Sequence, residues 1–136
     1  EALGRITFYG NDNGPNITQF AEIIGSINRY AHTEEAGILE LKVAVVDGAD
    51  PEITTGLKLT GSKTINGRID VELGSATSSL TKVIGELNVE SAKQSTATGN
   101  GALVVKGGVG IAENLHVGGT LDVTGKTNLN KLYFFQ

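Results

Sequence analysis

The two histidines are the side chains best suited to acid–base chemistry in this sequence. His32 opens a polar stretch at residues 32–37, and His116 lies between Leu115 and Val117. A general base normally has a neighbouring group that orients its ring, and neither histidine has an obvious one nearby in the sequence. We therefore expect neither histidine to be catalytic.

Two pairs of carboxylates are close enough in sequence to suggest glycoside hydrolysis, which uses two acidic side chains across the scissile bond. They are Glu34 with Glu35 and Asp70 with Glu72. Asp70 and Glu72 alternate with apolar residues, and charges in that pattern are usually just solvated. The chain also offers few rings for stacking on sugars, with 3 Tyr, 4 Phe and no Trp. We predict that it is not an enzyme.

Oxygen-rich turns at residues 11–14 and 47–50 contain the side chains that calcium prefers. Neither fits an EF-hand loop, which needs a glutamate at its twelfth position, and turn formation explains the same residues. The glycine string at residues 107–110 lacks the Gly-Lys-Ser/Thr ending of a phosphate-binding loop. We predict no metal site and no cofactor.

The composition limits how a core can be built. The chain has 136 residues, of which 39% are hydrophobic, with no Cys, Met or Trp. Val, Ile, Leu and Ala must therefore supply nearly all of the core, which favours a narrow core or one shared between chains. Nineteen glycines and two prolines indicate many short strands and turns, and exclude collagen.

The distribution of charged and apolar residues argues against two classes of function. The net charge is −4, with acidic residues in excess before residue 90 and basic ones after it. Neither part has a basic stripe with interleaved aromatics, so we expect no nucleic-acid partner. No apolar run is long enough for a membrane-spanning helix, so we expect no membrane insertion. The chain begins at Glu1, so we expect a fragment or a processed product.

The first ninety residues are expected to form an antiparallel β module. Residues 5–9 are a short β-rich run, stopped by the turn residues 10–15. Residues 20–31 fit either an amphipathic helix or a strand, and Gly25 with its β-branched neighbours favours the strand. In that strand residues 21, 23, 25 and 27 share one face, opposite Glu22, Ser26 and Asn28. Strict alternation then predicts a half-buried strand at 39–43, so that residues 20–46 form one long hairpin.

Three further strands are expected in this module. A turn at residues 47–51 precedes Leu57 and Leu59, which are separated by a lysine. The Asn66-Gly67 pair is a hairpin signal, and alternating residues at 69–73 follow it. A last alternating run covers residues 83–89.

A repeat of six residues organises the end of the chain. Residues 91–100 contain no large apolar side chain, and we interpret them as a linker. From Gly101 the sequence divides into GALVVK, GGVGIA, ENLHVG, GTLDVT, GKTNLN and KLYFFQ. In the first five blocks the third and fifth positions are aliphatic except at Thr127: Leu103, Val105, Val109, Ile111, Leu115, Val117, Leu121, Val123 and Leu129.

This repeat predicts a triangular coil. Residues two apart on a strand point to the same side, so each block directs two side chains inward, and small residues at the block junctions allow a bend. A single-chain β-helix would have too few turns, because such stacks usually need about three repeats. We therefore favour three chains around a shared axis, with the nine aliphatic residues as the trimer core. A series of ordinary hairpins remains the alternative.

Residues 98–125, TGNGALVVKGGVGIAENLHVGGTLDVTG, carry a family resemblance. This string resembles a motif of tail-fibre and other virion structural proteins of marine phages, cyanophages especially. Residues 4–27, 37–44 and 56–62, GRITFYGNDNGPNITQFAEIIGSI, GILELKVA and GLKLTGS, look like a companion module of such proteins. The resemblance implies a trimeric, elongated, β-structured appendage that often contributes to host attachment.

These observations together predict an all-β homotrimer. Residues 1–90 form the antiparallel β module, 91–100 the linker, and 101–136 a triangular, triple-stranded β-helix-like stalk. The expected function is a structural segment of a tail fibre or spike in the virion, with other virion proteins and a host surface receptor as partners. A glycan-processing (depolymerase-type) fibre domain and a capsid decoration protein are the alternatives.

Overall fold

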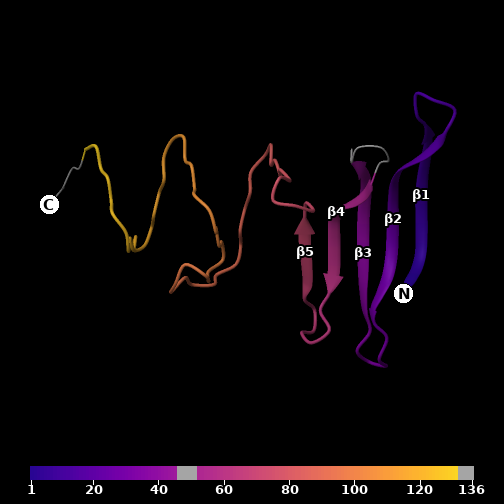
Figure 1. Cartoon of the computed structure of the whole chain (residues 1–136). Coiled ribbons are helices and arrows are strands. Elements are labelled where there is room, and N and C mark those ends of the chain that lie inside the picture. Colours follow the sequence, from indigo (N-terminus) through magenta and orange to yellow (C-terminus); the bar gives the residue numbers. More distant parts are fainter. Residues whose placement is uncertain (46–51, 132–136) are drawn as a thin grey trace. The chain divides into compact units, whose positions relative to one another are not determined.

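The chain folds into one antiparallel sheet followed by a long segment without regular secondary structure (Figure 1). A computed structural model describes residues 1–45 and 52–131. The strands follow one another in space in the order of the sequence. They are β1 (Ala2–Asn11), β2 (Ile17–Arg29), β3 (Ala36–Val45), β4 (Glu52–Gly61) and β5 (Ile69–Leu73). The described residues contain no helix, which confirms the all-β prediction.

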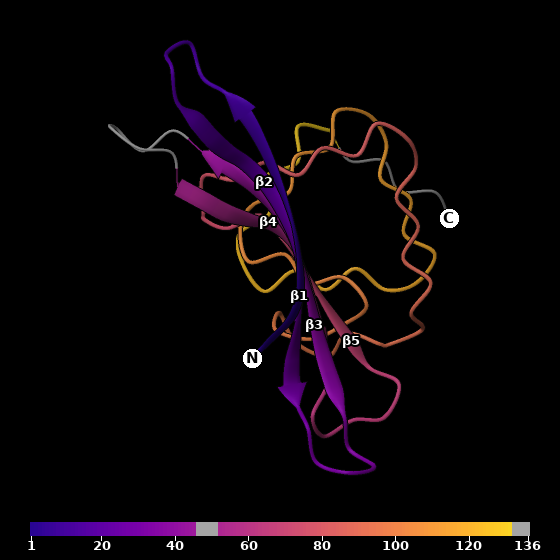
Figure 2. The same cartoon turned by 90° about the vertical axis from the view of Figure 1, so that its right-hand side faces the viewer.

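The long hairpin predicted for residues 20–46 is confirmed. β2 is a strand and not a helix, and it pairs with β3 in the register Ile23↔Leu41 and Gly25↔Leu39. As predicted, residues 21, 23, 25 and 27 share one face of β2. Figure 2, turned by 90°, shows the twist of the five strands that their right-handed backbone imposes.

Two predicted turns form, by different means. At the first, the carboxylate Oδ1 of Asp12 accepts a hydrogen bond from the Gly14 N–H at 2.7 Å, an Asx-type turn. At the second, the Arg68 N–H donates to the Ile65 carbonyl at 3.4 Å, and Gly67 adopts a φ of 74° that other residues avoid. The turn predicted at residues 47–51 lies outside the described residues.

The sheet has two chemically different faces. Cross-strand pairing aligns Ile6, Ile23, Leu41, Leu57 and Leu73 in one row, and Gly4, Gly25, Leu39, Leu59 and Val71 in the next. We call the side that carries these two rows the apolar face. The opposite side, the polar face, carries charged residues from all five strands: Arg5, Glu22, Glu40, Lys42, Lys58, Asp70 and Glu72.

Almost nothing is buried within this sheet. Among the described residues, the buried ones are Ile24 and Glu22, each 6% exposed, and both lie on the polar face. The predicted half-burial of β3 is not reached, because Leu39, Leu41 and Val43 are 38–52% exposed. The sheet is a single layer, and the described residues of β1–β5 provide nothing to cover its apolar face.

The chain divides into two units, Glu1–Glu86 and Leu87–Gln136. The strand predicted at residues 83–89 is wrong: these residues form no strand, because no neighbouring backbone pairs with them. The described part of the second unit contains no strand either, and its trace winds in broad turns (Figures 1 and 2). The triple-stranded stalk stays a prediction, since its pairing would require further chains.

Candidate assembly surfaces

The polar face carries a chain of ion pairs that runs across the strands. The Glu22 carboxylate lies 3.5 Å from the Arg5 Nε on β1 and 3.9 Å from the Lys42 Nζ on β3. Lys42 also lies 3.9 Å from Glu40. Opposite charges on neighbouring strands stabilise their pairing.

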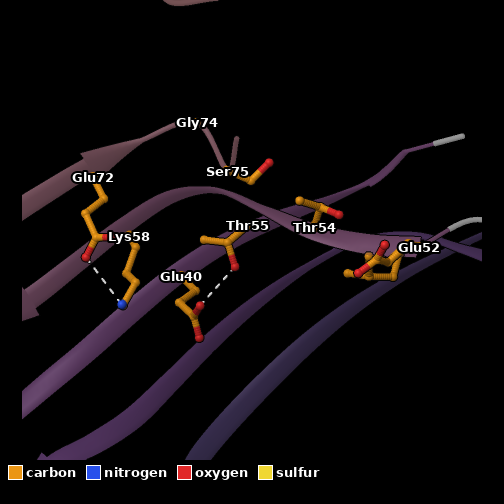
Figure 3. A pocket seen from close by; sticks show the side chains of 9 residues that line it. Glu40, Glu52, Thr54, Thr55, Lys58, Glu72, Gly74 and Ser75 are labelled. Carbon is orange, nitrogen blue, oxygen red and sulfur yellow. Dashed lines mark hydrogen bonds and ion pairs between the residues drawn. The ribbon is translucent and has the colours of Figure 1, made fainter. Parts of the chain in front are cut away.

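Figure 3 shows a shallow pocket on this side of the sheet. Within it, the Lys58 Nζ lies 3.3 Å from Glu72, and the Thr55 hydroxyl donates to Glu40 at 2.9 Å. The two carboxylates therefore each have a cation or a hydroxyl as partner. Among the described residues, none with an aromatic ring lines the pocket.

Among the described residues considered for chemistry, His32 and Glu35 lie close together, and the others are exposed or paired with basic side chains. Asp70 is paired with the Arg68 Nε at 2.7 Å, while Glu72 is paired with Lys58. The His32 side chain is 96% exposed and 3.9 Å from Glu35, and His116 is exposed in the second unit. In the described residues, no three acidic or histidine side chains cluster in a way that could hold a metal ion. The candidate turn at residues 47–50 lies outside them.

The apolar face is the largest exposed hydrophobic feature of the sheet. Its aliphatic rows span all five strands, and the exposed fractions rise to 58% at Ile6 and 59% at Val71 and Leu73. Soluble monomers rarely leave a contiguous apolar patch of more than a few hundred Å² in water. The apolar face is therefore a candidate surface for association.

After Gly101, the exposed fraction of the aliphatic side chains follows the six-residue repeat. In the first four blocks, third-position residues (Leu103, Val109, Leu115 and Leu121) are 63–68% exposed. Fifth-position residues (Val105, Ile111, Val117 and Val123) are 46–50% exposed. The structure thus keeps the period of six, and it leaves all nine proposed core residues, including Leu129, accessible in the single chain.

The backbone of residues 88–130 forms few hydrogen bonds inside the chain, and those that are present lie in residues 91–100. Within residues 87–130, the one backbone–backbone hydrogen bond joins the Asn100 N–H to the Ala97 carbonyl at 3.2 Å. Folded proteins normally form about one internal hydrogen bond per residue, mostly between backbone groups. An extended chain with free N–H and C=O groups is available to pair with other chains.

The solvent-accessible surface of the chain is larger than that of a compact protein of the same mass. The chain exposes 12215 Å². A compact monomer of its mass would expose about 6,700 Å², and two separate compact units about 8,100 Å². The excess is therefore roughly 4,000 Å² or more per chain, which is in the range that obligate oligomers bury.

The apolar face of the sheet is the exposed surface that sequence reasoning missed. The alternation predicts which residues share a face, but it indicates half-burial within the module. One signal is present in the sequence: Gly25 lies among the isoleucines of β2, and glycine inside a strand often marks a bulge or the close approach of another backbone or ligand.

Comparison with known proteins gives no relative: no family model, no curated protein and no solved structure matches the chain. The described residues also contain no helix that is long and apolar enough to cross a membrane. Function must therefore be argued from the surfaces themselves.

Proposed function

We propose that this chain is a structural segment of a virus particle, one third of a trimeric tail fibre or spike that contributes to host attachment. The observation that carries the proposal is the six-residue repeat, whose paired aliphatic side chains are all exposed in the single chain. Three copies around one axis would cover these side chains from every side. No catalytic role is assigned to the chain.

Two further observations support a role in assembly. The excess surface of the chain matches the area that permanent complexes bury. The unpaired backbone of residues 101–130 offers donors and acceptors along its length, which neighbouring chains in the same conformation would satisfy. The sequence resemblance to marine-phage virion proteins supports the assignment of this assembly to a tail fibre or spike.

The test is the mass of the purified chain in solution. Light scattering at micromolar concentration should give three times the chain mass of 14.1 kDa. A monomer or a dimer would contradict the proposal. Immunogold electron microscopy with antibodies to the chain should then label an appendage of the virus particle, and labelling of the capsid shell alone would favour a decoration protein.

A further inference from the structure

Of the two glycines in one row of the apolar face, Gly4 adjoins a register shift in β1, where glycine is common, whereas Gly25 has no explanation within the chain. Gly4 and Gly25 are paired across β1 and β2, and neither has a positive φ. A Cβ atom built on either glycine would meet no atom within 4 Å. Larger side chains, which favour strands, would therefore fit both positions in the single chain.

The row that contains these two glycines has large aliphatic side chains on the other three strands. It continues from Gly4 and Gly25 to Leu39, Leu59 and Val71 on the next three strands. One half of the row is thus a notch without side chains, and the other half is an aliphatic ridge. A surface with a notch at one side and a ridge at the other suits head-to-tail contacts, which close into a ring under three-fold symmetry.

We infer that the apolar face is a second interface between copies of this chain, in which the aliphatic ridge of one copy lies in the glycine notch of the next. The inference rests on the proposed trimer and adds the sheet to it. The partner that covers the apolar face is a further copy of this chain, because the two rows contain no charged residue that would attract a charged partner.

The first test is a pair of substitutions at adjacent residues on opposite faces. Gly25→Val should stabilise a free-standing sheet, since valine favours strands and the site is empty. In the proposed interface the valine would fill the notch, so we expect a lower melting temperature or loss of the trimer. The control Ser26→Val lies on the polar face and should keep the trimer and its melting temperature. A trimeric Gly25→Val chain with a raised melting temperature would overturn the inference.

The second test uses the absence of native cysteines. Leu39 is 42% exposed in the single chain, more than the partly covered Ser26. On a free sheet, Leu39→Cys would therefore react with a maleimide at least as fast as Ser26→Cys. The inference predicts the reverse, with Leu39→Cys slower by about tenfold or more.

A cross-link then identifies what covers the face. A short bis-maleimide applied to Leu39→Cys, Leu59→Cys or Val71→Cys should yield covalent dimers with at least one of the three variants. Slow labelling with no dimer from any of them would mean that the chain covers its own sheet, and would overturn the inference. A trimer with fast labelling at Leu39→Cys would overturn it too, while leaving the proposed function intact. A monomeric parent chain would instead overturn the proposed function.

Discussion

Glu22 is the charged residue that the sheet buries most deeply in the described part of the chain. It is 6% exposed and reaches Arg5 and Lys42, and it accepts a hydrogen bond from the Gln19 amide at 3.0 Å. A buried carboxylate is tolerated only with such partners. The sequence placed Glu22 on the polar side of β2, but it gave no sign that this residue is buried, since burial depends on side chains from β1 and β3.

This geometry predicts unequal roles for two carboxylates of the polar face. Glu22→Ala should lower the free energy of unfolding by about 1–3 kcal/mol, because its partners lose a buried acceptor. Glu72→Ala removes an exposed ion pair and should cost between about 0 and 1 kcal/mol. Urea unfolding of both variants at one chain concentration measures the difference, and equal costs would contradict the assigned role of Glu22.

Among the elements, the sheet was predictable and the winding segment was not. Alternation predicts the strands β2, β3 and β5. Their order in the sheet is simple, because each strand pairs with its neighbour in the sequence. The predicted bounds were short, as at β1, where residues 5–9 became Ala2–Asn11, because pairing with β2 extends the strand past its apolar centre. At residues 83–89 the same alternation gave no strand, since a strand also needs a neighbour, and that information is absent from a local pattern.

The six-residue register is tested by two adjacent residues in one block. If fifth positions face the shared axis, Val117→Asp places three like charges in one buried layer and should block trimer assembly or lower the melting temperature steeply. His116→Asp faces outward and should change stability by no more than about 0.5 kcal/mol. Light scattering and thermal melting compare the two variants.

Further third- and fifth-position variants separate the register from a chance arrangement. Leu103→Asp, Ile111→Asp and Val123→Asp should behave like Val117→Asp, because their side chains repeat its place in the coil. Equal tolerance of aspartate at positions 116 and 117 would refute the six-residue register and remove the main support for the fibre proposal.

At the scale of the whole molecule, folding and association should be one event. The single chain buries one apolar side chain among its described residues, far too little to offset the entropy lost on folding. Under the proposed assembly its stability comes from contacts between copies, and stability that depends on association rises with concentration.

Thermal melting of the intact chain at several concentrations tests this coupling. The melting temperature should fall by a few degrees for each tenfold dilution, because dilution favours the separated, unfolded chains. The spectroscopic signal of the β-sheet and the trimer mass should be lost over the same temperature range. A melting temperature that does not change with concentration, accompanied by a folded monomer, would contradict it.

The order of the strands has a consequence for how the molecule is made. Because β1 to β5 are neighbours in sequence as well as in space, every pairing closes a short loop, and such contacts form quickly. Under the proposed assembly, each strand can join the sheet as synthesis proceeds, whereas residues 101–130 emerge after the sheet and must meet two other chains. The slow step is then the encounter of chains, during which the apolar face is open to aggregation. The rate of particle production would then depend on the local concentration of newly made chains at the site of synthesis.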